Sequence, residues 1–273
     1  MISEEDKARI VEYSTNNRFH SAKDIKNNLH LAASRETINR ELNRMGFKVY
    51  KAPRKPLLTK KNMLRRPRFA RDHRNWGYRE WSSVVFTDEC AFKLINTTNR
   101  ILVRRRADEA YQPNTIQPSD SYSKTVMIWG AISVDGVGPL VRINETVDSN
   151  VYISILRHWL RRYYPGLYGG GLIFQQDNAP AHRTSAVDEW FEGYGIEVLD
   201  WPTKSPDLNI IEGIWSHLKY KFRGRIFRDE DELWRELQKF WRQVGDRFIQ
   251  NYYRSLPNRM RALIKAKGGY IKY

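Results

Sequence analysis

The stretch SSVVFTDECAFKL, residues 82–94, is a near-continuous apolar run that carries a carboxylate. Such a run is typical of a β-strand that other elements cover on both faces. We expect this strand to end in Asp88, which places the carboxylate at the rim of a sheet. A second run, GLIFQQDNAPAH at 171–182, repeats the pattern and ends in Asp177. The two runs predict a sheet that is buried on both sides.

The segments around these runs predict the rest of the sheet and its helices. TVMIWGAIS and GPLVRI read as a hairpin around VDGVG, and IEVLDW at 196–201 reads as a short strand. Helices are expected over 149–163, from about His182, and from the end of WPTKSPDLNIIEGIW at 201–215, with Glu212 in the first turn of the last helix. Three strands in a meander, a helix, then strand, helix, strand and helix indicate a mixed α/β sheet covered by helices.

The first 50 residues predict a separate all-α module. Ser3 with Asp6 and Ser21 with Asp24 have the spacing of helix N-caps, and Ser34 opens a third segment. Three short helices with a tight turn before the last match the helix-turn-helix plan. The third helix presents polar side chains opposite its apolar face, and we expect the following to contact DNA bases or backbone: Arg35, Thr37, Arg40, Asn43 and Arg44. The alternative is an ordinary solvated helix face.

A basic tract follows, KAPRKPLLTKKNMLRRPRFARDHR at 51–74, with three prolines and ten Lys or Arg residues. Its prolines favour an extended linker that runs along DNA phosphates. The tract also has the composition of a nuclear import signal, and a solvated linker is a third interpretation. We therefore expect a helix-turn-helix module at 1–50, a basic linker and helix at 51–80 and a catalytic domain at 81–273. The phosphate-facing residues are expected to be Lys51, Arg54, Lys55, Lys60 and Lys61.

Composition favours a nucleic-acid partner. The chain has 47 Lys and Arg against 31 Asp and Glu, a formal net charge of +16. Residues 1–75 hold 19 basic and 8 acidic side chains, so +11 of that charge lies in the front quarter. DNA or RNA is the usual partner of such a field, although an acidic membrane surface or protein remains an alternative. One cysteine, Cys90, indicates a reducing compartment, and neither a membrane span nor a secretory signal is visible.

Three carboxylates are candidates for one site: Asp88, Asp177 and Glu212. Each has an ordinary explanation, since Asp after a strand is usually a turn residue and Asn209 with Glu212 has capping-box spacing. Strand ends of an α/β sheet converge at one rim, however, and clustered carboxylates need protons or cations. Mg²⁺ suits such a set, because it prefers oxygen ligands and needs few protein carboxylates.

Three blocks resemble the catalytic motifs of Tc-one/mariner transposases: FTDE at 86–89, FQQDNAPAH at 174–182 and WPTKSPDLNIIEGIW at 201–215. Thirty-four residues separate Asp177 from Glu212, the spacing of the Tc-one branch. The resemblance implies an RNase-H-like α/β catalytic domain whose metal-binding triad falls on Asp88, Asp177 and Glu212. It implies two Mg²⁺ ions, for which Mn²⁺ substitutes, and double-stranded DNA as substrate. It further implies that water cleaves the DNA at the terminal inverted repeats and that the freed 3′ hydroxyl then attacks a TA target.

The resemblance also suggests a homodimer, because two element ends must be paired, and a nuclear protein with no membrane association. His182 matches a histidine after the second block and is expected to contact phosphate or support the site. Asp207 is expected to form a turn, and neither it nor Glu89 is expected to bind metal.

Four departures from the family pattern stand out. Ile210 replaces a usual proline, and Gly213 predicts a first helical turn that is looser by up to about 1 kcal/mol. The region 96–124, which matches the family's subunit-contacting clamp, lacks the usual glycines. We also expect that the first of two helix-turn-helix modules is missing from this chain.

The main alternative function is a decayed or domesticated copy that binds DNA without cutting it. Intact carboxylates at all three positions favour the enzyme. A generic RNase-H-like nuclease is a third hypothesis, which the helix-turn-helix and the proline-rich third block argue against.

Overall fold

The computed structural model describes residues 2–50, 56–95 and 124–272. They form two compact units, one up to Pro56 and one from Leu57, and each has its own hydrophobic core. The linker residues Lys51, Arg54 and Lys55 lie outside the described residues, as does the expected clamp region, 96–124, up to residue 123. None of the described helices is long and apolar enough to cross a membrane.

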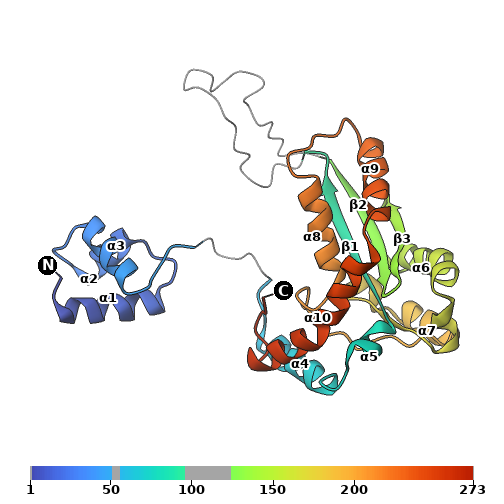
Figure 1. Ribbon diagram of the computed structural model, residues 1–273, viewed down its shortest axis with the longest axis horizontal. Helices are drawn as coiled ribbons and strands as arrows, with labels where there is room; N and C mark the ends of the chain where they lie inside the picture. Colours follow the sequence, from blue (N-terminus) through green and yellow to red (C-terminus); the bar gives the residue numbers. More distant parts are fainter. Residues whose placement is uncertain (1, 51–55, 96–123, 273) are drawn as a thin grey trace. The chain divides into compact units, whose positions relative to one another are not determined.

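The N-terminal unit consists of three helices, α1 (Glu4–Asn16), α2 (Ala22–Leu29) and α3 (Arg35–Arg44) (Figure 1). Side-chain oxygens of Ser3, Ser21 and Ser34 accept hydrogen bonds at the three helix starts, which confirms the N-caps predicted from their spacing. His30 ends α2 in a left-handed conformation, so the chain turns into α3 within four residues. Five buried side chains form the core: Ile10, Ala22, Ile25, Leu31 and Ile38.

The second unit contains a four-stranded sheet in the order β3-β2-β1-β4 (Figure 1). The antiparallel hairpin predicted around VDGVG is present, and β1 pairs with β2 antiparallel and with β4 parallel. The strands are β1 (Val84–Lys93), β2 (Thr125–Ser133), β3 (Gly136–Ile143) and β4 (Ile173–Gln175).

Two expected elements differ from the structure. IEVLDW forms no strand of its own and contributes one parallel bridge, from Val198 to Phe174, because β4 is only three residues long. The helix expected from about His182 begins later, because Pro180–His182 forms a single 3₁₀ turn, η3, and Thr184 then caps the helix.

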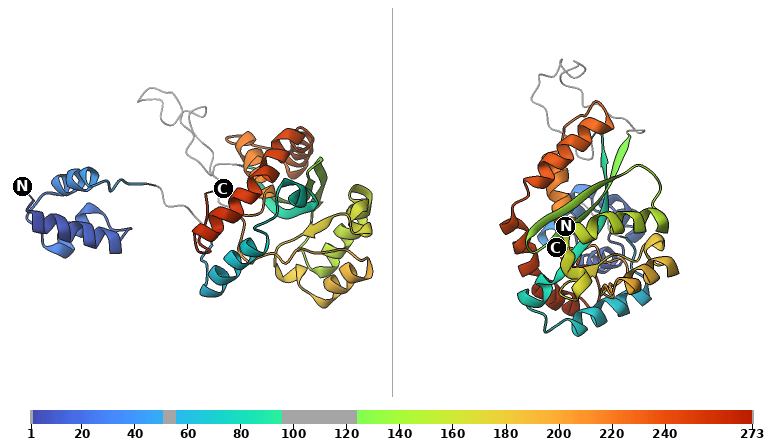
Figure 2. Two further views of the ribbon diagram at one scale, coloured as in Figure 1. Left: turned by 60° about the horizontal axis from the view of Figure 1, so that its bottom comes forward. Right: turned by 90° about the vertical axis from the view of Figure 1, so that its right-hand side faces the viewer.

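Helices cover both faces of the sheet (Figure 2). One face packs against α6 (Ser149–Tyr163), which was predicted over the same residues, and α7 (Ser185–Gly193). The other face packs against α8 (Ile211–Lys221), α9 (Glu230–Arg242) and α10 (Asp246–Lys265). Alternation along β1 explains the two layers, since Phe86 belongs to the second core and its neighbour Val85 to the first.

Two further helices lie before the sheet in sequence, α4 (Lys60–Asp72) and α5 (Tyr78–Ser82), and both contact α10. A short 3₁₀ segment, η2 (Pro165–Gly169), follows α6. The predicted mixed α/β sheet with helices on both faces is therefore confirmed.

Candidate active site

The three predicted carboxylates line one cavity of about 270 Å³. Asp88 comes from β1, Asp177 follows β4, and Glu212 lies in the first turn of α8. The structure therefore brings residues that are far apart in sequence around a single space. The rest of the wall is loop with both polar and apolar side chains: Asn178, Ala179, Trp201, Pro202, Thr203, Lys204, Ser205, Pro206 and Asn209.

Asp88 lies in the middle of β1, so the expectation that its strand ends there was wrong. The strand continues because β2 pairs with it as far as Lys93, with Asp88 opposite Gly130. The partner on the other side, β4, reaches only as far as Phe86 of β1. Thr87 extends that contact, since its hydroxyl donates to the carbonyl of Gln175 (2.8 Å). Asp88 thus emerges where the neighbouring strand has stopped.

The electrostatics of Asp88 favour a protonated or cation-bound carboxyl group. Burial raises the pKa of Asp88 well above its ordinary value, and repulsion from Glu212, Glu89 and Asp177 raises it further. A bound cation would reverse this effect by balancing the clustered negative charge.

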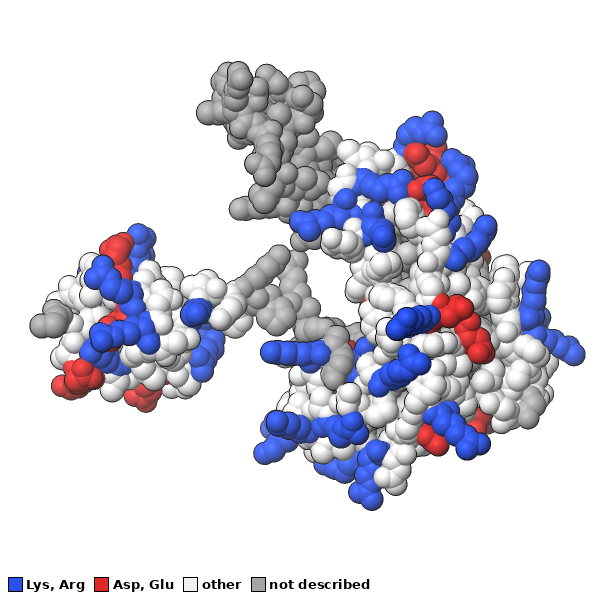
Figure 3. All heavy atoms as spheres, viewed as in Figure 1, with Lys and Arg blue, Asp and Glu red and all other residues white. Residues whose placement is uncertain are grey.

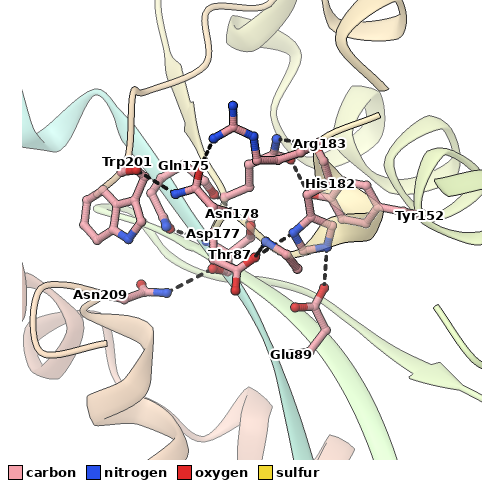
Figure 4. Close-up of polar contacts among 12 residues, drawn as sticks. Thr87, Glu89, Tyr152, Gln175, Asp177, Asn178, His182, Arg183, Trp201 and Asn209 are labelled. Atoms are coloured by element: carbon pink, nitrogen blue, oxygen red, sulfur yellow. Dashed lines mark hydrogen bonds and ion pairs between the residues drawn. The ribbon is translucent and has the colours of Figure 1, made fainter. Parts of the chain in front are cut away.

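Asp177 has the opposite surroundings (Figure 4). Its Oδ1 accepts hydrogen bonds from the backbone N–H of Ala179 and from His182 Nδ1, both at 2.8 Å. Partial burial works against ionisation, but these hydrogen bonds prevail and lower the pKa of Asp177. The side chain is about half exposed, at 49%. Asp177 is therefore a stably charged carboxylate held in one orientation.

His182 links the two faces of the sheet. Its Nε2 lies 3.4 Å from a carboxylate oxygen of Glu89, which points to the face opposite Asp88, and its Nδ1 contacts Asp177. Tyr152 of α6 stacks on the imidazole ring, with centroids 3.9 Å apart. Burial lowers the pKa of His182, but the contacts with Asp177 and Glu89 outweigh it and raise the pKa to about 9. The histidine thus supports the site as an imidazolium.

Glu212 is held beside Asp88 by the start of α8. The helix begins at Ile211 and its N-cap residue is Ile210, so the alternative explanation of Asn209 and Glu212 as a capping box does not hold. Isoleucine has no polar atom to cap with, and Asn209 Nδ2 instead donates to the carbonyl of Thr87 (3.1 Å). That bond joins the segment before α8 to the strand that carries Asp88.

Gly213 has a packing role that the sequence did not reveal. The ring of Tyr252 on α10 lies directly against it, and a Cβ at this position would overlap the ring. Glycine at this position allows α8 to approach α10 closely, although glycine also lowers the helix propensity of the first turn of α8.

The loop that forms the cavity wall is fixed by a buried ion pair. Asp207 lies in a turn, as predicted, and its carboxylate also pairs with a distant arginine, which the sequence did not reveal. Arg66 of α4 makes two parallel hydrogen bonds to the Asp207 carboxylate, at 2.8 and 2.6 Å, and both side chains are fully buried. Ile271 donates its N–H to the same carboxylate, and Arg259 of α10 donates to the Asp207 carbonyl. Arg66 also binds the carbonyl of Gly268 (2.8 Å). Three distant segments therefore meet at the base of the loop.

The side chains present fit a divalent cation. Three carboxylates line one cavity, and the repulsion that Asp88 receives from its acidic neighbours is one that a bound cation would relieve. Within the described residues, no three or more His, Cys, Asp and Glu side chains are gathered into a ready-made metal cluster. The residues that would hold the ion are Asp88, Asp177 and Glu212.

The predicted DNA-contacting residues of α3 are largely at the surface. Arg35, Arg40, Asn43 and Arg44 are exposed, while Thr37 is half-buried beside the cap residue Ser34. Arg35 pairs with Glu36 at 2.9 Å. In the second unit, Lys60 and Lys61 are exposed at the start of α4.

Comparisons with known families match most of the chain. A family described as DDE superfamily endonuclease matches residues 83–234, and a Tc3-type helix-turn-helix family described as Transposase matches residues 7–75. The chain is 34% identical to the Tcb2 transposase of Caenorhabditis briggsae, over 97% of this chain and 98% of that protein. It is 33% identical to the Tc1 transposase of Caenorhabditis elegans, over 88% of each.

Solved structures show the same fold at lower identity. The Mos1 mariner paired-end complex with Mn has a TM-score of 0.79 at 22% identity, covering 100% of this chain and 81% of that chain. The catalytic domain of Mos1 transposase gives 0.62 at 21% identity, covering 80% and 100%. The second unit therefore has the RNase-H-like fold. The expectation that a helix-turn-helix is missing is not supported, since that family matches here and Tcb2 transposase aligns over nearly its whole length.

Proposed function

The chain belongs to the Tc1/mariner family of DDE transposases, enzymes of cut-and-paste DNA transposition, and we propose that the cavity of Asp88, Asp177 and Glu212 is its catalytic centre. The observation that carries this proposal is the convergence of three carboxylates from β1, the end of β4 and α8. Its substrate is proposed to be the terminal inverted repeats of its element, and its target a TA site.

Two Mg²⁺ ions, or Mn²⁺ in their place, would activate the attacking oxygen and stabilise the leaving oxygen of the phosphodiester. The protein's own groups orient this reaction. His182 keeps Asp177 charged and fixes its orientation. Asn209 joins the segment that precedes Glu212 to β1, the strand that carries Asp88. Lys204 lines the same cavity and its Nζ donates to the carbonyl of Leu57 (3.2 Å), and a contact of this ammonium with a DNA phosphate is part of the proposal.

Neutral amide variants test the catalytic assignment. Asp88→Asn, Asp177→Asn and Glu212→Gln should each abolish nicking of labelled repeat DNA in Mg²⁺, because each removes a charged metal ligand. Binding to the same DNA should persist, because the helix-turn-helix unit is unchanged. Glu192→Gln, on the exposed surface of α7, is the matched control and should cut like the parent. Nicking by Glu212→Gln at the parent rate would remove Glu212 from the centre, and binding without nicking by the parent would support the decayed-copy alternative.

The N-terminal unit is proposed to read the repeats through α3. Lys and Arg side chains are spread over the face of each unit that Figure 3 shows, which suits binding to the DNA backbone. The proposed assembly is a homodimer that pairs two element ends, and the proposed compartment is the nucleus.

Charge-loss variants separate base contacts from phosphate contacts. Arg40→Ala and Arg44→Ala should weaken binding to the cognate repeat by about 1–3 kcal/mol more than binding to scrambled DNA. Loss of Lys60 and Lys61 should weaken both equally and flatten the log–log salt dependence by about one unit for each contact. A salt titration with both duplexes measures these effects. Equal losses on both duplexes for the two arginine variants would overturn the assignment of α3 as the recognition helix.

A further inference from the structure

Asn209 has one amide atom in use and one unused. The side chain is buried, with 4% of its surface exposed, and its Nδ2 donates to the carbonyl of Thr87. Its Oδ1 is also buried and meets no hydrogen-bond donor among the described residues. Figure 4 shows this oxygen pointing away from the contact with Thr87. An unpaired buried acceptor costs about 1–3 kcal/mol, so this atom is expected to have a partner in the working protein.

The orientation of the amide is fixed by its neighbour. A carbonyl oxygen accepts and cannot donate, so the amide group that faces Thr87 O must be the NH₂. Turning the amide over would place two acceptors against each other and leave a buried donor unused. The atom left for a further interaction is therefore an oxygen.

The place of that oxygen suggests which partner it takes. Asn209 lines the same cavity as Asp88, Asp177 and Glu212, three residues before Glu212 in the chain. Mg²⁺ and Mn²⁺ accept amide oxygens together with carboxylates, and a neutral donor adds no repulsion to a set that already strains Asp88. An ion at about 2.1 Å also needs less room beside a buried oxygen than a water at about 2.8 Å.

We propose that Asn209 Oδ1 is a further protein ligand of the divalent cation held by the carboxylates. This rests on the metal-binding role proposed above for Asp88, Asp177 and Glu212. Asn209 then has two functions, in which its nitrogen anchors the segment before α8 to β1 and its oxygen completes the cation site. Glu212 and Asn209 reach the ion from one continuous segment, so cation binding fixes the start of α8.

Binding of Mn²⁺ to the full chain without DNA tests the proposal independently of cleavage. Mn²⁺ can be followed by electron paramagnetic resonance and by the rise in melting temperature with Mn²⁺ concentration. Asn209→Ala should weaken Mn²⁺ binding by about tenfold or more. Asn209→Asp should strengthen it, because a carboxylate replaces the amide oxygen while the anchor to Thr87 is lost. A purely structural role predicts weakening in both variants, since both lose that anchor.

Thr203→Asp is the matched control, because it adds a negative charge to the same cavity wall away from Asn209. Asn209→Asp should raise Mn²⁺ affinity more than Thr203→Asp does. Equal effects of the two aspartates, or parent-like binding by Asn209→Ala, would overturn the assignment of Oδ1 as a ligand. Parent-like binding by Asp88→Asn as well would instead contradict the metal site itself, so the two failures are distinguishable. The melting temperature of each variant without metal shows that it is folded.

Discussion

The two aspartates of the cavity are the same residue type in opposite surroundings. Asp177 is half exposed and accepts hydrogen bonds from His182 and the backbone of Ala179, whereas Asp88 is enclosed among other carboxylates. The pKa of Asp177 is lowered and that of Asp88 is raised. Asp177 therefore has a cationic partner, His182, before any metal ion binds. Asp88 instead faces repulsion that a bound metal ion would relieve. The fold therefore stabilises the charged form of Asp177 through hydrogen bonds, whereas it destabilises the charged form of Asp88 through burial and repulsion.

The largest expected effect is on the free energy of unfolding, and it comes from the buried ion pair of Asp207, in the loop that forms part of the cavity wall. Asp207→Asn would leave the buried Arg66 guanidinium without its counter-charge, and we expect the free energy of unfolding to fall by about 3–5 kcal/mol. Denaturant unfolding without metal measures it. Arg228→Met, in the exposed pair with Glu232, is the control and should leave the unfolding midpoint unchanged. If Asp207→Asn unfolds at the parent's midpoint, the buried pair does not hold this wall.

A second prediction concerns the Asp177 side and has a defined pH range. The pKa of His182 is raised from 6.5 to about 9 in the folded protein. Its contribution to stability is therefore fully present below pH 6.5 and is lost as the pH rises to about 9. At about 1.4 kcal/mol per unit of pKa, the loss is about 3 kcal/mol.

The measurement is metal-free stability of the parent and of His182→Gln between pH 6 and 9.5. The variant cannot become an imidazolium, so its stability should decline less over this range. Parallel curves for the two proteins would contradict the ion pairs of His182 with Asp177 and Glu89.

The smallest prediction compares the two aspartates directly, and the signs should be opposite. Without metal at pH 8, Asp88→Asn should raise the free energy of unfolding by about 1–2 kcal/mol, because the amide removes repulsion among buried carboxylates. Asp177→Asn should lower it by about 1 kcal/mol, a modest loss because the side chain is half exposed. Thermal unfolding of both variants checks the signs. Two changes in the same direction would remove the distinction between the two sides.

Local signals in the sequence predicted the features that neighbours along the chain determine. Ser3, Ser21 and Ser34 cap helices because the partner N–H lies three residues away, and the turn VDGVG joins two strands that pair directly. The apolar run at 82–94 predicted a strand buried on both faces, and β1 is such a strand. The mixed α/β sheet followed from these parts.

Features that depend on distant partners were not visible in the sequence. Asp207, between Pro206 and Leu208, has the local pattern of a turn, while its partner Arg66 lies 141 residues earlier. The end of β4 at Gln175 was not visible either, because it depends on where the pairing with β1 stops, at Phe86. The free oxygen of Asn209 becomes visible only when the partner of its nitrogen is known.

The buried ion pair of Arg66 and Asp207 has a consequence for how the enzyme is made on the ribosome. The hydrogen bonds of the Asp207 carboxylate are complete only when Ile271, which is synthesised 64 residues later, donates its N–H. Arg66 likewise donates to the carbonyl of Gly268. The N-terminal helices can fold while translation continues, because their core involves no later residue. The wall of the cutting site must wait for those later residues. During synthesis, the N-terminal unit can therefore be complete before the cavity wall has formed.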